Sequence, residues 1–181
     1  MKVISVQSSP NLNGLTSSLA QAALRGVNAT GGETELIHLN NLNIEPCIAC
    51  DDGWGICRTD GACILEDDFQ TLYAKIAQCD ALIFATPVYW HDISESAKIF
   101  LDRLRRCERG RDFKTFLGKK VIGIASAGGS GRGAVRALYA LEEYLRRFGF
   151  DIFDLVPVTR FSKGHKLEML EKAGTRLLDE A

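Results

Sequence analysis

Four of the six cysteines lie within a stretch of 17 residues, at Cys47, Cys50, Cys57 and Cys63. Closely spaced thiolates are the usual ligands of zinc ions and iron–sulfur clusters, and an activated thiol is also a redox group. Tetrahedral zinc sites usually have two short Cys-x2-Cys pairs, whereas this chain has one. Our main interpretation is therefore reduced structural thiols with no metal assigned. An iron–sulfur or zinc site and a redox role are the alternatives.

The remaining cysteines, Cys79 and Cys107, fall near the ends of predicted helices, where we expect them to be packing residues. A basic stretch surrounds the second of them, and we expect it to form a solvated face; contact with a nicotinamide phosphate is the alternative. Its residues are Arg103, Arg105, Arg106, Arg109 and Arg111.

Small polar residues fill the segment 8–18, SSPNLNGLTSS, between an apolar run and a predicted helix. The free N–H groups and the dipole at a helix N-terminus attract an anion, and side-chain hydroxyls add further donors. The segment matches neither the P-loop pattern nor the dinucleotide-binding glycine pattern. We interpret it as a site for a phosphate monoester, with a simple helix cap as the alternative.

Two further loops follow apolar runs and carry distinctive residues. Residues 87–92, PVYWHD, place adjacent aromatic rings where a flat ligand could stack, unless the rings pack against the next helix. His91 in this loop is a possible donor or acid, although a lone histidine is more often structural. Residues 127–133, AGGSGRG, have four glycines, which allow a ligand to approach the backbone closely. Arg132 could contact a phosphate or an anionic ring there.

The elements that position these loops alternate between strand and helix. We expect strands at residues 2–7, 33–39, 81–86, 119–126 and 150–156, and helices at 15–27, 67–78, 94–106, 134–148 and 166–179. Such alternation predicts an α/β fold in which helices cover both faces of a parallel sheet. Five strands favour the flavodoxin-like order 2-1-3-4-5, a three-layer sandwich. In such sheets ligands bind at the carboxyl ends of the strands, where the three loops meet.

The chain is expected to form one domain over residues 1–181, with a cysteine-rich insertion at about 40–66 and a surface loop at 105–116. Apolar residues make up 46% of it, and 22 basic residues balance 23 acidic ones. This composition argues against a disordered chain and against a general nucleic-acid binder. Because no apolar run approaches the length of a membrane span or a signal peptide, we expect no membrane partner and a cytoplasmic location.

Two segments resemble the NADPH-dependent FMN reductase and multimeric flavodoxin family, which is related to the iron–sulfur flavoproteins. SSPNLNGLTSSL at 8–19 is similar to that family's phosphate loop, usually GSPRxNGNT. The block that runs from Cys63 through TPVYW to Leu104 is similar to its second conserved region. The resemblance covers residues 1 to about 135. Asn11 stands where the family usually has arginine and Leu15 where it has asparagine, which changes polar contacts to the phosphate.

The resemblance implies FMN as cofactor and NAD(P)H as cosubstrate. It implies that Ser9, Asn11, Asn13, Thr16 and Ser17 hold the FMN phosphate. The isoalloxazine ring would meet Pro87, Val88, Tyr89, Trp90, His91, Ala127, Gly128 and Gly129. The expected activity is reduction of a small acceptor, such as a quinone, flavin, nitro or azo compound, by a homodimer or homotetramer. An electron-transfer flavoprotein and a redox sensor that uses the cysteine-rich loop are the alternatives, and we assign no catalytic side chain.

Overall fold

A computed structural model describes residues 1–179. It contains one five-stranded sheet in which every pairing is parallel and the strand order is 2-1-3-4-5, as predicted. The strands are β1 (Lys2–Gln7), β2 (Glu33–His38), β3 (Ala81–Pro87), β4 (Lys120–Ala127) and β5 (Asp151–Thr159). Every residue of β3 is buried, which explains its unbroken apolar sequence, whereas β2 at the sheet edge is largely half-buried.

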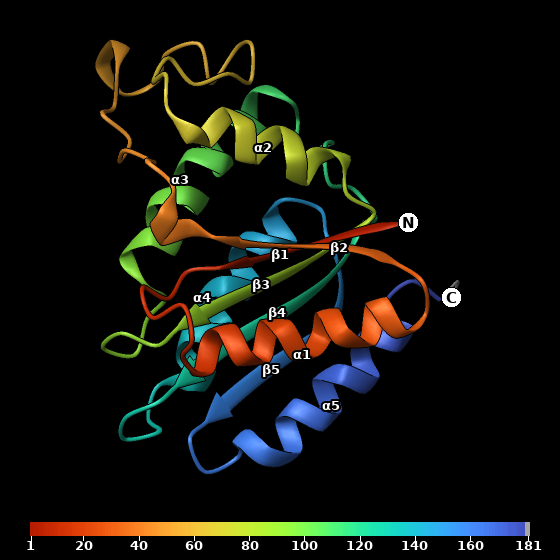
Figure 1. The fold of residues 1–181 in the computed structure, drawn as a ribbon. Coiled ribbons are helices and arrows are strands. Elements are labelled where there is room, and N and C mark those ends of the chain that lie inside the picture. Colours follow the sequence, from red (N-terminus) through yellow and green to blue (C-terminus); the bar gives the residue numbers. More distant parts are fainter. Residues whose placement is uncertain (180–181) are drawn as a thin grey trace.

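Helices cover both faces of the sheet, which makes the predicted three-layer sandwich (Figure 1). α1 (Leu15–Ala29) and α5 (Lys163–Arg176) lie on one face. α2 (Asp68–Gln78), α3 (Glu95–Gly110) and α4 (Ala134–Arg147) lie on the other. Each face has its own apolar cluster, so the two cores meet only through the sheet.

Three expectations about the helices are wrong in detail. α3 continues to Gly110, so the predicted surface loop at 105–116 begins with a helical turn, and Cys107 lies within that helix rather than at its end. Arg103 is 1% exposed instead of solvated, because α3 turns that face toward the cysteine-rich segment.

The cysteine-rich segment 40–66 has two short 3₁₀ turns, η1 (Leu39–Asn41) and η2 (Asp51–Gly53), and otherwise no regular structure. It extends beyond α2 and α3, at the top of Figure 1. The three other loops of interest, which follow β1, β3 and β4, all lie at the left edge of the sheet in that view.

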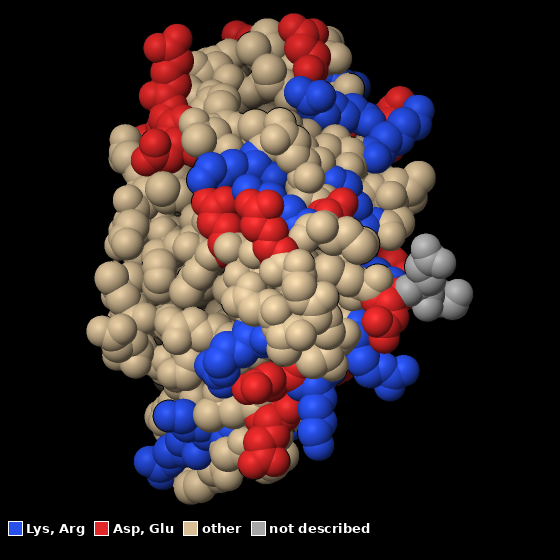
Figure 2. All heavy atoms as spheres, turned by 45° about the vertical axis from the view of Figure 1, so that its right-hand side comes forward, with Lys and Arg blue, Asp and Glu red and all other residues tan. Residues whose placement is uncertain are grey.

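Acidic and basic side chains are interspersed over the face shown in Figure 2. Ion pairs near the surface include Lys75 with Glu35 at the β2 edge and Arg25 with Glu171 between α1 and α5. Surface pairs of this kind contribute little to stability, about 0–1 kcal/mol each. Within residues 1–179, no helix combines the length and apolarity that crossing a bilayer requires.

Candidate functional site

Hydrogen bonds draw the three carboxyl-end loops into one site. The Ser8 N–H donates to the carbonyl of Ala85 at 3.0 Å, which attaches the first loop to the end of β3. The Val88 N–H donates to the carbonyl of Ser126 at 2.9 Å, which attaches the second loop to β4. The hydroxyls of Thr16 and Ser126 lie 2.8 Å apart, so the start of α1 is attached to β4 as well.

The first loop is folded around its own polar side chains. The Asn11 N–H donates to Ser9 Oγ at 3.2 Å, and the Asn13 N–H donates to Asn11 Oδ1 at 3.2 Å. The loop enters α1 at Gly14, which is the N-cap residue and has no side chain to cap the helix. The N–H groups of the first turn, residues 15–17, therefore have no side-chain acceptor within the described chain. Free donors at a helix N-terminus suit a phosphate.

Gln7 anchors the first loop through Ser9 and was not identified from the sequence. Its Oε1 accepts the Ser9 N–H at 2.8 Å, its Nε2 donates to the Ser9 carbonyl at 3.1 Å, and the same nitrogen contacts His38 Nδ1 on β2. Ser94, the N-cap residue of α3, adds a hydroxyl 2.8 Å from Ser8 Oγ. Gln7 is a polar residue at the end of an apolar strand, and this position could have identified it from the sequence.

The second loop is a tight two-residue turn with strained backbone. Tyr89 and Asp92 exchange backbone hydrogen bonds at 2.9 and 3.0 Å. Between them, Trp90 and His91 have φ of 47° and 68°, in the left-handed region that such turns require. Turns of this type usually have Asn-Gly, and a non-glycine residue in this region costs about 1–3 kcal/mol. The strain presents the Trp90 ring to solvent, with 96% of the residue exposed.

The third loop leaves open space beside the other two. A methyl group added at Gly128 or at Gly129 would meet no atom within 4 Å, so a ligand can lie against this backbone. Ala127 is buried at the end of β4, and Pro87 is buried at the end of β3, so both would offer backbone rather than side-chain contacts. A methyl group at Gly133 would lie 2.7 Å from His91 Cα, which shows how closely the second loop packs against the start of α4.

The residues predicted from the sequence thus gather on three adjacent loops at one sheet edge. Sequence reasoning missed the open groove next to them, whose wall includes His91, Arg136 and Tyr139. Arg136 and Tyr139 lie three residues apart on the exposed side of α4, and this spacing could have indicated a wall of the groove from the sequence. The arrangement combines phosphate donors, aromatic rings and exposed backbone, which suits a phosphorylated flat aromatic ligand.

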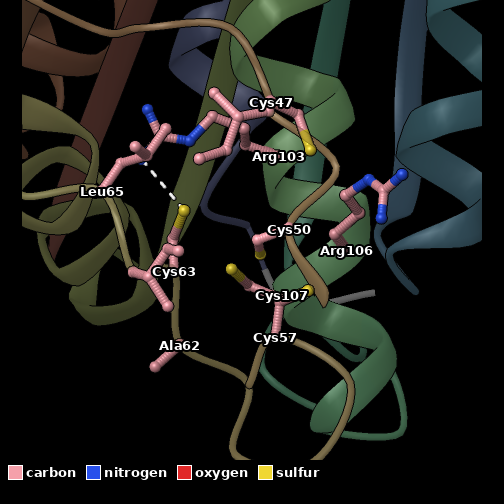
Figure 3. A pocket seen from close by; sticks show the side chains of 11 residues that line it. Cys47, Cys50, Cys57, Ala62, Cys63, Leu65, Arg103, Arg106 and Cys107 are labelled. Atoms are coloured by element: carbon pink, nitrogen blue, oxygen red, sulfur yellow. Dashed lines mark hydrogen bonds between the residues drawn. The ribbon is translucent and has the colours of Figure 1, made fainter. Parts of the chain in front are cut away.

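A second candidate site lies away from these loops, in the cysteine-rich segment. A small pocket there is lined by five of the six cysteines together with two arginines (Figure 3). We call it the cysteine pocket; its thiols are Cys47, Cys50, Cys57, Cys63 and Cys107. Within the described part of the chain, no three cysteine, histidine or carboxylate side chains are grouped closely enough to hold one metal ion. The thiols line the pocket without converging on one position, which does not favour a mononuclear zinc site.

Arg103 of α3 fixes the wall of the cysteine pocket. Its guanidinium donates to both carboxylate oxygens of Asp67, at 2.5 and 3.0 Å, to the Glu45 carbonyl at 2.9 Å and to Cys63 Sγ at 3.2 Å. Burial disfavours the charged form of Asp67, but hydrogen bonds from Arg103 and from backbone N–H groups outweigh it and lower the pKa of this carboxyl. The bidentate pair therefore joins α3 to both ends of the cysteine-rich segment.

The thiol of Cys107 is 1% exposed and faces the same pocket from α3. Burial, and then the neighbouring Cys63 and Cys57, raise its pKa to about 12, so without a metal it is a neutral thiol at physiological pH. Sequence reasoning assigned Cys107 to packing. Its helical spacing from Arg103, four residues earlier, was the signal that the two share a face.

The strand order and the ligand site at the carboxyl ends of β1, β3 and β4 define a flavodoxin-like α/β protein. The family model described as NADPH-dependent FMN reductase matches residues 1–160. The chain belongs to this family of flavin-dependent oxidoreductases.

Two relatives illustrate the range of the family. The chain is 33% identical over 130 residues to an iron–sulfur flavoprotein of Methanocaldococcus jannaschii, a match over 71% of this chain and 65% of that protein. It is 29% identical over 153 residues to YwqN of Bacillus subtilis, provisionally described as an NAD(P)H-dependent FMN-containing oxidoreductase, over 83% and 78% of the two chains. The match spans less than two thirds of the length of this M. jannaschii protein and of an iron–sulfur flavoprotein each from Archaeoglobus fulgidus and Methanosarcina thermophila.

Among solved structures, the NAD(P)H:quinone oxidoreductase from Methanothermobacter marburgensis superposes with a TM-score of 0.75. The superposition covers 100% of this chain and 98% of that one at 18% identity, which supports the fold alone.

Proposed function

We propose that this protein is an FMN-dependent NAD(P)H oxidoreductase that reduces a small acceptor. The observation that carries the proposal is the meeting of three loops: hydrogen bonds bring the uncapped first turn of α1, the open backbone at Gly128 and the aromatic turn at Trp90 to the same edge of the sheet. The family match and the relationship to YwqN support FMN as the ligand.

Each loop has a part in this proposal. Ser9, Asn11, Asn13, Thr16 and Ser17 bind the FMN phosphate through hydroxyls, amides and first-turn N–H groups. The ring lies against the backbone of residues 127–129 and of 87–88, and the turn formed by Tyr89, Trp90 and His91 shields it from water. Bound FMN supplies hydride and electron transfer, while the protein supplies position and electrostatics. No side chain of the site is required as a proton donor.

The acceptor we propose is a quinone, free flavin, nitro or azo compound. The fold shared with a quinone oxidoreductase makes a quinone the first acceptor to assay. We also propose a cytoplasmic homodimer or homotetramer. Val135 and Tyr139 on the outer face of α4 are 71% and 61% exposed, and they offer an apolar surface for such an assembly.

Flavin titration with matched variants tests the cofactor site. Gly128→Leu places a side chain in the open space beside the loops. Gly164→Leu is the control, because it places the same side chain in open space on α5, which carries none of the three loops. We expect FMN to bind the wild type and Gly164→Leu equally and to bind Gly128→Leu at least tenfold more weakly. Riboflavin, which lacks the phosphate, is expected to bind the wild type more weakly than FMN. Equal FMN affinity in all three proteins would contradict the site.

Stopped-flow mixing with NADPH or NADH then separates an oxidoreductase from an electron carrier. Bleaching of protein-bound flavin absorbance within seconds, followed by reoxidation when a quinone is added, is expected. Flavin that stays oxidised with both nucleotides would favour the electron-transfer alternative.

A second candidate function is favoured by the cysteine pocket: an iron–sulfur centre in addition to the flavin. We propose that the pocket holds a cluster, because thiols from separate parts of the chain surround one cavity beside Arg103 and Arg106, whose charges offset those of cluster thiolates. The name of the M. jannaschii relative supports this assignment. Iron and acid-labile sulfide measured after anaerobic purification test it. Protein that binds neither, even after incubation with Fe²⁺ and sulfide, would leave structural or redox-active thiols as the explanation.

A further inference from the structure

The cysteine pocket has five thiols, one more than the four that a cubane or a two-iron cluster uses. Four of them come from the segment 40–66, and the fifth, Cys107, comes from α3. Either Cys107 lines the pocket without binding the cluster, or one of the four cysteines of the segment does not bind it.

One face of the C-terminal half of α3 is fixed to the cysteine-rich segment. Arg103, Arg106, Cys107 and Gly110 are spaced three and four residues apart, so they lie on this face. Arg106 donates to the Gly53 carbonyl and lies over the Trp54 ring. A methyl group at Gly110 would lie 2.5 Å from the carbonyl oxygen of Cys57, so helix and loop backbones are in contact there. The position of Cys107 relative to the loop is therefore fixed by packing on both sides.

Cys47 is the thiol that is least enclosed. It is exposed, whereas Cys57 and Cys107 are buried and Cys50 and Cys63 are half-buried. Its sulfur accepts one hydrogen bond within residues 1–179, from the Ala49 N–H at 3.5 Å. In Figure 3 the sulfurs of Cys50, Cys57 and Cys107 extend into one part of the pocket, and the sulfur of Cys47 lies at another end of it.

The pocket also holds a buried donor with no acceptor. Arg103 is 1% exposed and lines the pocket, and its Nε has no hydrogen-bond partner among residues 1–179. Its two other nitrogens already bind Asp67, Glu45 and Cys63. A sulfide or thiolate ligand inside the pocket would supply an acceptor, and N–H donors to sulfur are a feature of iron–sulfur sites.

We propose that Cys107 of α3 is a ligand of the cluster, together with Cys50, Cys57 and Cys63, and that Cys47 is not. This proposal rests on the iron–sulfur centre proposed above and assigns its ligands. It makes the cluster a link between the cysteine-rich segment and the helix whose first residues contact the phosphate loop through Ser94.

Three alanine variants test the assignment: Cys107→Ala, Cys47→Ala and, as a matched control, Cys79→Ala, a buried thiol outside the pocket. Each protein is reconstituted anaerobically with Fe²⁺ and sulfide, and bound iron, sulfide and the reduced-state EPR spectrum are measured. Loss of a ligand is expected to lower bound iron to about a tenth or less in Cys107→Ala. Cys47→Ala and Cys79→Ala are expected to match the wild type. Circular dichroism before reconstitution checks that all three are folded.

A measurement on the unmodified sequence covers the case in which Cys107→Ala does not fold. Iodoacetamide added to the reconstituted wild type is expected to alkylate Cys47 without release of iron. Protection of Cys47 by the cluster, or release of iron on its alkylation, would overturn the proposal, as would full iron content in folded Cys107→Ala. Wild type that never binds iron would refute the iron–sulfur centre itself, and the ligand assignment with it.

Discussion

Replacing Arg103 with methionine removes the charge from the buried pair with Asp67 while keeping much of the side-chain volume. Arg103 and Asp67 have side-chain exposures of 1% and 3%. Loss of one member of such a pair leaves the other charge buried and uncompensated, which costs about 3–5 kcal/mol. For a chain of this length, this corresponds to a fall in Tm of roughly 6–20 °C. Because the total free energy of unfolding is about 5–15 kcal/mol, the variant is still expected to fold.

Urea unfolding of Arg103→Met, Asp67→Asn and the double variant measures this cost and the coupling between the two side chains. The double variant has no uncompensated charge, so its destabilisation should be smaller than the sum of the single effects. Arg25→Met is the matched control, since Arg25 contacts Glu171 at 3.1 Å with about half of each side chain exposed. It should cost less than about 1 kcal/mol. A cost of this small size for Arg103→Met, or strict additivity in the double variant, would refute the reasoning.

The pair also predicts how stability depends on pH. The pKa of Asp67 is lowered in the folded protein, so the folded state favours the carboxylate. This contribution is complete above the pKa of the unfolded chain, about 3.9, and is lost as the pH falls through the lower folded value. The stability difference between the wild type and Asp67→Asn should therefore shrink below about pH 4. A difference that stays constant from pH 6 to pH 3 would contradict this assignment.

The other predictions concern the strained turn, the thiols and the helix contact on the far face. Trp90→Asn with His91→Gly should raise the free energy of unfolding by about 1–3 kcal/mol in urea, because both residues have positive φ; it should also weaken FMN binding. In native protein without iron, the exposed Cys47 should react with Ellman's reagent before the buried Cys107, whose pKa is about 12. Gly26→Ala should cost at least about 1–3 kcal/mol, because its methyl group would lie 2.0 Å from the carbonyl of Glu171 on α5.

The last two of these predictions have matched controls. Gly164→Ala on α5 adds a methyl group in open space and should change stability by less than about 0.5 kcal/mol. Unfolding in urea should expose Cys107 to the reagent at once. A turn variant that loses stability, a Cys107 that reacts as fast as Cys47, or a Gly26→Ala protein as stable as the Gly164→Ala control would each count against the corresponding argument.

The sequence by itself determined the order of strands and helices and the three loops of the proposed flavin site. The central strands have nearly continuous apolar runs, and loops at the carboxyl ends of β1, β3 and β4 must meet once the sheet is parallel. The polar and glycine-rich composition of residues 8–18 and 127–133 was therefore sufficient to place them together. Gln7 was missed although its place at the end of an apolar strand was a signal, whereas the strain at Trp90 was not visible, since it depends on backbone geometry that composition does not encode.

Only the tertiary structure decided what the cysteines and arginines do. Arg103 and Cys107 lie in a basic, mainly polar helix, and such a pattern alone indicates a solvated surface. Their partner is the segment 40–66, which has no periodicity and therefore gives no signal of which helix face it covers. Because the contacts join residues about 40–60 positions apart, from Cys63 and Glu45 to Arg103, they exist only after the sheet has brought α3 and this segment together.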